Sequence, residues 1–225
     1  MKFVLQFIDA IPAAGSDADW SAPLSIDVPE GSWSVVRTTP ERSHQLVRIA
    51  VGSALAAAGT VTVLESPVGS WSRSERRRRL AEFGVLLDPA GLASNLSLND
   101  NVAIPTTYRG LMSRAAADAA AASLLDELEI RAYAGRRPPD VPEDVRQLAA
   151  LGRTLMGKPR FLLLENPLAA VKSRAAATVW ALCRRLVPSA LVTTFRRDET
   201  LYNLADALYL WDAAGMRRAA SVANA

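Results

Sequence analysis

The spacing of apolar and polar residues changes along the chain, and with it the type of element that each segment predicts. Alternation and short apolar runs predict β-strands, most of which lie toward the two ends of the chain. The predicted strands are Lys2–Ile8, Leu24–Val28, Trp33–Val36, Thr60–Leu64, Gly84–Leu87, Phe161–Leu164, Ala190–Thr193 and Ala207–Trp211. Phe161–Leu164 is apolar throughout, which is typical of a strand buried on both faces.

Helical spacing dominates the middle of the chain, where residues 92–156 are rich in alanine. The predicted helices are Ser43–Ala58, Ser74–Phe83, Asn101–Ile104, Ala115–Leu128, Asp144–Met156, Ala175–Leu186 and Glu199–Ala205. We expect Gly59 to end the first helix and Ser74 to cap the second. Breaks are expected at Pro105 and at Arg137–Pro142. Strands on both sides of a helical stretch indicate an α/β domain with an all-helical insertion.

The composition supports a folded domain and excludes some kinds of functional site. The chain has 225 residues, of which 50% are hydrophobic and 22% charged. These values exclude a disordered tail, a collagen-like fibre and a disulfide-rich miniprotein, and they allow one sizeable domain or two small ones. The net charge of +3 is a small surplus and gives only weak support for a nucleic-acid partner. Because Cys183 and His44 are the only residues of their types, an intrachain disulfide and a His-rich metal site are excluded.

Neither the start of the chain nor any later segment favours a membrane span. Gln6 and Asp9 interrupt the first apolar run, so a strand fits it better than a leader peptide. The longest uncharged run, Ile49–Leu64, contains glycines and threonines and falls short of the ~20 apolar residues that a spanning helix needs. We therefore expect a soluble chain that reaches a membrane only through a partner.

Three segments, taken in order, resemble the ATP-binding subunit of ABC transporters. GVLLDPAGLASNLSLNDNVAIP at Gly84–Pro105 resembles the family's Q-loop and the segment after it. LAALGRTLMGKPRFLLLENP at Leu148–Pro167 resembles the helix after the signature motif and the Walker B strand. ALVTTFRRDETLYNLADALYLWDAAG at Ala190–Gly215 resembles the switch strand, the family's L-A-D segment, a further strand and a terminal Gly turn. The resemblance covers essentially the whole chain, and the middle segment is most similar to the Mla/Mce-type branch that serves lipid trafficking.

The resemblance implies an architecture and a set of partners. It implies a P-loop NTPase (ABC ATPase-like) core with an inserted all-helical subdomain at about 92–156, in a single domain spanning 1–225. The implied partners are a membrane permease subunit and a second ABC ATPase-like subunit, in a homodimer or a heterodimer. The implied location is cytoplasmic, on the inner face of the cell membrane, where the permease would hold the chain.

The segment in the place of the family's P-loop departs furthest from the family pattern. A working P-loop reads G-x-x-x-x-G-K-S/T, and its backbone N–H groups, lysine and hydroxyl hold the phosphates and Mg²⁺. Here Val35–Ile49 contains no glycine, Ser43 stands at the Lys position and His44 at the Ser position. Pro40 removes a donor, and Glu41 places an anion where phosphate would lie.

Arginines near this segment leave two interpretations open. Arg37, Arg42 and Arg48 could hold a phosphate loosely, or they could be ordinary surface charges beside a helix that opens at Glu41. The second interpretation is the one we favour from the sequence.

The other positions that bind nucleotide in the family are also altered. Asp88 replaces the Q-loop glutamine, and Glu165 with Asn166 replaces the Asp-Glu pair of Walker B. An amide has no useful proton affinity near neutral pH, so Asn166 cannot act as the general base. Lys172 stands at the D-loop aspartate, and Phe195 stands at the switch histidine.

The signature motif, L-S-G-G-Q in the family, presents a helix N-terminus to the phosphate held by the opposite subunit. Its counterpart here consists of Val141, Pro142, Glu143, Asp144 and Val145. Proline and acidic residues suit the first turn of an ordinary helix, and they fill an anion site with negative charge. The sequence therefore predicts that the helix is kept and the phosphate site is lost.

Together these changes predict an ABC ATPase-like subunit without competent ATPase chemistry. Its predicted role is structural or regulatory in a membrane transport complex, with lipid as one cargo that the resemblance suggests. No cofactor and no specific nucleic acid are expected. One alternative is an active subunit that binds Mg·ATP at an atypical site, with Arg42 or Arg37 in place of the lysine and Glu165 as base. Another is a nucleic-acid-binding regulatory protein that uses Arg73 and Arg76–Arg79.

The family's permease groove lies at the Q-loop and the helical subdomain after it. By resemblance, candidate permease contacts are Leu92, Asn95, Leu96, Leu98 and Asn101. The alternative is that the apolar members of this set belong to the core of the subdomain.

Overall fold

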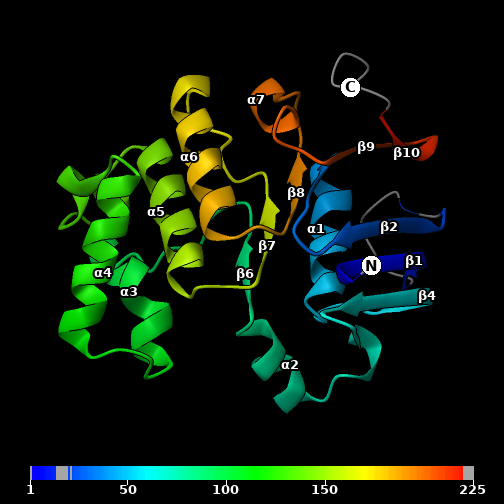
Figure 1. The fold of residues 1–225 in the computed structure, drawn as a ribbon, viewed down its shortest axis with the longest axis horizontal. Helices are drawn as coiled ribbons and strands as arrows, with labels where there is room; N and C mark the ends of the chain where they lie inside the picture. The colour runs from blue at the N-terminus through cyan, green and yellow to red at the C-terminus, as the bar shows by residue number, and fades with distance from the viewer. Residues whose placement is uncertain (1, 14–19, 21, 220–225) are drawn as a thin grey trace.

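The computed structural model describes residues 2–13, 20 and 22–219. At its centre lies a six-stranded sheet with the order β10-β9-β3-β8-β7-β6. Its strands are β3 (Trp33–Arg37), β6 (Phe83–Leu86), β7 (Phe161–Glu165), β8 (Ala190–Thr194), β9 (Ala207–Asp212) and β10 (Gly215–Arg218). Neighbouring strands are parallel, except that β10 is antiparallel to β9 at one edge. The carboxyl ends of β3, β6, β7 and β8 therefore lie along one edge of the sheet (Figure 1).

The side chains of β7 pack into hydrophobic cores on both faces of the central sheet. Leu162 and Leu164 pack in a core on the helical side, while Phe161 and Leu163 pack in a core on the opposite side. All four are fully buried, which confirms the strand predicted from the uninterrupted apolar run. In the helical-side core the ring of Trp33 meets Trp180 edge to face, with 5.9 Å between ring centroids.

A second, antiparallel sheet covers the other side, with α1 (Pro40–Ala50) between the two sheets (Figure 1). Its strands, in sheet order, are β2 (Leu24–Pro29), β1 (Phe3–Pro12), β4 (Ala56–Val63) and β5 (Ser66–Pro67). Leu46, Val47 and Ile49 of α1 are buried in the core that also receives Phe161 and Leu163. This packing fixes α1 against the edge where β3 ends.

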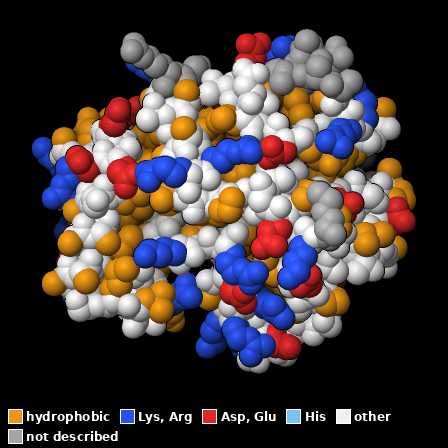
Figure 2. Space-filling view, viewed as in Figure 1, with side chains coloured by type: hydrophobic (Ala, Val, Ile, Leu, Met, Phe, Trp, Pro, Cys, Tyr) orange, Lys and Arg blue, Asp and Glu red, His pale blue; other side chains and the backbone are white. Residues whose placement is uncertain are grey.

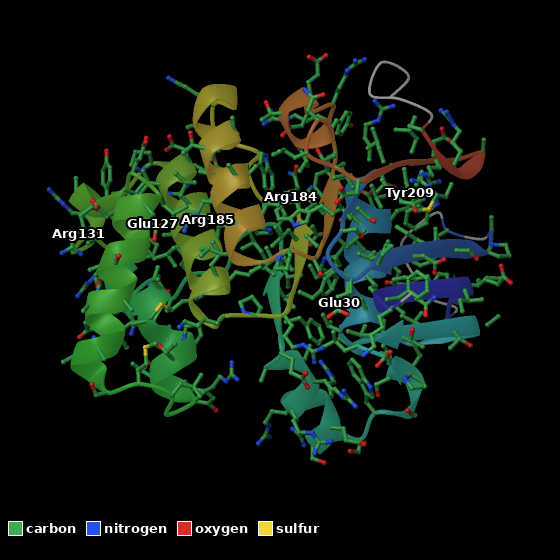
Figure 3. All side chains as sticks on the ribbon, in the orientation of Figure 1. Glu30, Glu127, Arg131, Arg184, Arg185 and Tyr209 are labelled. Atoms are coloured by element: carbon green, nitrogen blue, oxygen red, sulfur yellow. The ribbon has the colours of Figure 1, made fainter. Side chains whose placement is uncertain are left out.

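The helices of the middle segment pack on one another beyond the central sheet. They are α3 (Leu98–Tyr108), α4 (Arg114–Glu127) and α5 (Glu143–Met156). Next to them lies α6 (Ser173–Leu186), and Arg185 of α6 forms an ion pair with Glu127 of α4 (Figure 3). The remaining helices are α2 (Arg73–Leu80) and α7 (Glu199–Tyr202). None of the helices formed by the described residues has both the length and the apolar character needed to cross a membrane.

The helix predicted over Ser43–Ala58 is wrong at both ends. It begins at Pro40, with Thr39 as its cap, and the chain turns at Gly52, where φ is +68°. Ala56–Val63 forms β4 and pairs with β1, so strand pairing overrides the helical preference of the alanines. Gly59 does not end a helix. It lies within β4 with φ +74°, and a Cβ there would lie 2.3 Å from the backbone oxygen of Asp9.

Three smaller predictions also need correction. Ser72, not Ser74, caps α2, because its hydroxyl accepts from the Glu75 N–H and the Glu75 carboxylate accepts from the Ser72 N–H. Pro105 lies inside α3, and that helix continues to Tyr108, with Gly110 in the turn after it, where φ is +64°. The last predicted helix ends earlier than Ala205. The strand β10 was not predicted.

Candidate functional site

The link between β3 and α1 is too short to form a phosphate cradle. Only Thr38 and Thr39 separate Arg37, the end of β3, from Pro40, the start of α1. The Thr39 hydroxyl accepts a hydrogen bond from the Arg42 N–H, and Pro40 has no N–H to offer. A P-loop needs several free backbone N–H groups that curl around an anion. The helix therefore begins where the family's loop would be, and the loss of phosphate binding stays a prediction.

The buried carboxylate of Glu165, at the end of β7, joins three of the predicted site residues. Glu165 is 2% exposed. The Ser43 hydroxyl donates to its Oε1 at 3.1 Å, and the Asp88 N–H donates to its Oε2 at 3.2 Å. The Nδ1 atom of His44 lies 3.5 Å from Oε2, and the His44 side chain is half exposed. Ser43 is thus the hydroxyl next to the carboxylate, although the motif alignment placed it at the Lys position.

Two further hydrogen bonds close this cluster, which we call the Glu165 cluster: Ser43, His44, Asp88, Glu165, Asn166 and Thr193. The Ser43 and Thr193 hydroxyl oxygens lie 2.6 Å apart, and the Asn166 amide donates to the Asp88 carboxylate at 2.8 Å. The residues come from α1, β7, β8 and the segment after β6, which share one edge of the sheet. The polar groups of the cluster thus contact one another.

Burial raises the pKa of the Glu165 carboxyl above its ordinary value of 4.5. The hydrogen bond from the Asp88 N–H and the nearby His44 and Ser43 oppose that rise without reversing it. The groups around Glu165 therefore offset only part of the cost of burying its charge.

This pKa shift predicts a pH dependence of stability. Because the folded chain binds the Glu165 proton more tightly than the unfolded chain, the free energy of unfolding should fall as pH rises from 4.5 through the folded pKa. Above the folded pKa the cost of the buried charge is fully present. Glu165→Gln keeps hydrogen-bonding atoms and removes the titration, so it should flatten this dependence. Urea unfolding between about pH 5 and about pH 8 measures it, and an unchanged slope in the variant would contradict the assignment.

A pocket of about 630 Å³ lies beside the Glu165 cluster, at the start of α1. Arg42, Phe195 and Trp211 are among its lining residues. Arg42 is 5% exposed, and its guanidinium carbon lies 5.8 Å from the centre of the Trp211 ring. Trp211 also meets Trp20 edge to face, with 4.7 Å between centroids. Phe195 thus lines a pocket that combines aromatic rings with two arginines, Arg37 and Arg42, and two acidic residues, Glu41 and Asp212.

The five residues of the altered signature segment lie at the start of α5, away from the edge that carries the Glu165 cluster. Val141 and Val145 are buried, whereas Pro142 and Glu143 are exposed. The Asp144 carboxylate accepts from the Val145 N–H at 2.9 Å. The first turn of α5 therefore presents acidic side chains, as the sequence predicted, and uses one of its own N–H groups internally.

Two of the predicted permease contacts are wrong, because their side chains are buried. Leu98 and Asn101 are both fully buried. Asn101 accepts from the Ala93 N–H at 2.7 Å and donates to the Ala93 and Ser97 carbonyls, each at 3.0 Å. These residues hold the segment after β6 in place and cannot contact a partner. Leu92, Asn95 and Leu96 are partly or fully exposed and stay predicted contacts.

Thr193 and Trp211 were not predicted to belong to the site. Both lie at the carboxyl ends of strands next to β3 or β7, where parallel strands bring their last residues together. Once the strand order is known, Thr193 and Trp211 can be recognised as site residues from their places near the ends of neighbouring strands. The sequence alone does not give that order.

Comparison with known proteins adds relatives in sequence and in fold. No family model matches the chain. It is 27% identical over 167 residues to the methionine import ATP-binding protein MetN 1 of Pseudomonas fluorescens, which covers 74% of this chain and 50% of that protein. It is 32% identical over 173 residues to the phosphonates import ATP-binding protein PhnC of Hyphomonas neptunium, which covers 72% of this chain and 64% of that protein. The chain thus spans between half and two thirds of these relatives.

Solved structures confirm the predicted fold. The ATP-binding cassette MJ0796, in a dimeric post-hydrolysis state with ADP and Pi, superposes with a TM-score of 0.82 at 16% identity, over 95% of this chain and 98% of that one. The cbiO1 protein of Clostridium perfringens, part of the ABC transporter complex cbiONQ, gives 0.78 at 12% identity, over 96% and 88%. The chain has the P-loop NTPase-like fold of ABC ATPase cassettes.

Proposed function

We propose that this chain, which has the ABC ATPase cassette fold and is similar in sequence to ATP-binding subunits of ABC import systems, is a non-catalytic subunit of a membrane transport complex. Its role is structural or regulatory. It pairs with a permease subunit and with a second cassette, as a homodimer or a heterodimer, and the permease holds it at the inner face of the membrane.

The observation that carries this proposal is the closed hydrogen bonding of the Glu165 cluster. In an active site of this family, the groups at Ser43 and Glu165 would hold Mg²⁺ and its water. Here Ser43 donates to Glu165 and bonds to Thr193, and Asn166 donates to Asp88. Mg²⁺ demands near-ideal octahedral oxygen ligation that includes phosphate oxygens, and the two-residue link before α1 forms no cradle to bring a phosphate there. The residues present do not fit Mg·ATP.

The alternative of an active site that uses an arginine in place of the P-loop lysine has weaker support. Arg42 is buried over the Trp211 ring. Burial raises the pKa of Tyr202, and the nearby Arg37 opposes that rise, so Arg37 interacts with the tyrosine hydroxyl. Both side chains have partners other than a phosphate. The acidic Glu41 also lines the same pocket.

The cargo is a separate proposal with less support. The relatives transport methionine and phosphonates by their names, whereas the resemblance of Gly84–Pro105 to the Mla/Mce-type branch favours a lipid. We propose a lipid cargo, and the resemblance of that segment is its only support. Growth or lipid-composition changes in a strain that lacks the chain would test it, separately from nucleotide chemistry.

Isothermal titration with Mg·ATP tests the proposed function. We expect no Mg²⁺-dependent binding tighter than about 1 mM, because neither a phosphate cradle nor a metal ligand set is present among the described residues. The control is the same titration with ATP and EDTA, and a parallel titration of Glu165→Gln. Binding that Mg²⁺ strengthens and Glu165→Gln weakens would overturn the proposal and favour the atypical active site.

A further inference from the structure

The helix α2 carries a concentration of positive charge that neither core nor site explains. Its eight residues include five arginines, and none of the eight is buried. Trp71 before the helix and Leu80 at its end pack against the core, so both ends are anchored. Arg76 donates to the Val51 carbonyl at 3.1 Å. The other arginines, Arg73 and Arg77–Arg79, project from a helix whose position is fixed.

Two acidic residues in and just after α2, Glu75 and Glu82, are engaged in local contacts, while Glu30 and Glu65 line a pocket that Arg79 also lines. The helix itself has five arginines against one glutamate. The Glu75 carboxylate caps the helix start, and hydrogen bonds from Ser72 hold its pKa below the ordinary value. Glu82 pairs with Arg160 at 3.1 Å. Figure 2 shows Lys and Arg side chains gathered over the part of the molecule where α2 lies, with Asp and Glu side chains among them.

An exposed apolar turn lies directly beside this helix. Tyr108 is 90% exposed and Leu111 is 55% exposed, at the end of α3. The turn is ordered, because the Gly110 and Leu111 N–H groups donate to the Thr107 and Thr106 carbonyls, the pattern of a Schellman cap. Exposed apolar side chains on a well-ordered turn are therefore a fixed property of the surface.

A hydrogen bond joins the turn to α2. Arg109, between Tyr108 and Gly110, donates to the carbonyl of Ala81 at 3.0 Å, and Ala81 is the residue that ends α2. Figure 1 also places α2 and the end of α3 on the same side of the molecule. We call this combined surface the α2 patch: Arg73, Arg77, Arg78, Arg79, Tyr108, Arg109 and Leu111.

We propose that the α2 patch binds an anionic membrane surface directly. The arginines supply attraction to acidic headgroups, and Tyr108 and Leu111 supply apolar contact at the level where aromatic rings favour the interface. Arginine side chains alone would suit the phosphates of nucleic acid equally well. Leu111 favours the membrane surface, because it has no flat ring to stack on a base, whereas the Tyr108 ring suits either surface. This proposal does not depend on the proposed lack of ATPase chemistry.

Co-sedimentation with vesicles tests the proposal on the full chain. We expect binding to phosphatidylcholine vesicles that contain about 30% phosphatidylserine, and little binding to phosphatidylcholine alone. Arg77→Gln, Arg78→Gln and Arg79→Gln together should weaken binding roughly 100-fold, at about fivefold for each charge. Tyr108→Ser with Leu111→Ser should weaken it severalfold at unchanged net charge. Neither variant touches a buried residue, so both should keep the wild-type melting temperature.

The matched control removes the same charge elsewhere. Arg131→Gln, Arg136→Gln and Arg137→Gln are exposed, and Figure 3 places Arg131 at the far end of the helical layer from α2. This control should bind anionic vesicles within about twofold of wild type. Equal loss in both triple variants, or equal binding to neutral and anionic vesicles, would overturn the proposal. So would tighter binding to a generic DNA duplex that is insensitive to the Tyr108 and Leu111 changes, which would assign the patch to nucleic acid.

Discussion

Phosphate release from Mg·ATP by the purified chain is expected to be about 10³-fold or more below that of an intact ABC cassette measured beside it. The general base alone is worth about 10²–10⁴-fold, and a positioned electrostatic donor about 10²–10³-fold. Asn166 stands at the position of the base, and the segment at Thr38–Thr39 supplies no lysine. The losses of the base and of the lysine both slow the same hydrolysis step, so their effects do not simply multiply. We therefore set the smallest expected reduction in rate at the effect of losing one group.

Restoring the base by itself should not restore turnover. In Asn166→Glu a carboxylate would face Asp88, which now accepts from the Asn166 amide at 2.8 Å, so two like charges would meet. We expect no gain in phosphate release and a lower stability. If Asn166→Glu raised turnover tenfold or more, or if wild-type turnover disappeared in Glu165→Gln, the nucleotide site would be functional and the proposed function would fail.

The second large effect is expected at Asn101. Asn101→Ala removes one acceptor and the donors to three carbonyls inside the fold, and it leaves the Ala93 N–H without its partner. Buried polar groups without partners cost about 1–3 kcal/mol each, so the free energy of unfolding should fall by about 2–4 kcal/mol. Urea unfolding followed by circular dichroism measures it.

Asn95→Ala is the matched control, because Asn95 has the same side chain, lies in the same segment and is exposed. We expect a change within about 0.5 kcal/mol there. Similar losses at both positions would mean that the segment after β6 is held by something other than the Asn101 amide. A normal stability in Asn95→Ala with weaker capture of a permease would instead support its predicted surface role.

The sequence predicted the central strands well because burial leaves a strong local pattern. Phe161–Leu164 and Ala190–Thr193 are apolar or nearly so, and both form parallel strands within one residue of the predicted ends. For Ala56–Ala58 the prediction was wrong, because this segment was predicted as helix and forms part of β4. Alanine favours helices, and only the pairing with β1, distant in sequence, makes this stretch a strand. Such long-range pairing has no local signature.

For the Glu165 cluster, the grouping of five residues could be predicted and their hydrogen bonding could not. The resemblance placed Ser43, His44, Asp88, Glu165 and Asn166 near one another, and the structure brings these five into one cluster. It did not reveal which group bonds to which. The register of α1 decides this, and the helix begins earlier than the motif alignment assumed because Thr39 caps it.

The two faces of the central sheet each hold one tryptophan pair. Trp33 and Trp180 lie in the helical-side core, and Trp20 and Trp211 lie in the core on the other side. Buried rings held in fixed surroundings give near-ultraviolet circular dichroism, so each core carries its own optical reporter. The chain can thus signal the loss of packing in either half without any label. Replacing one partner of a pair with Phe would weaken the signal of that half while the other pair stayed intact.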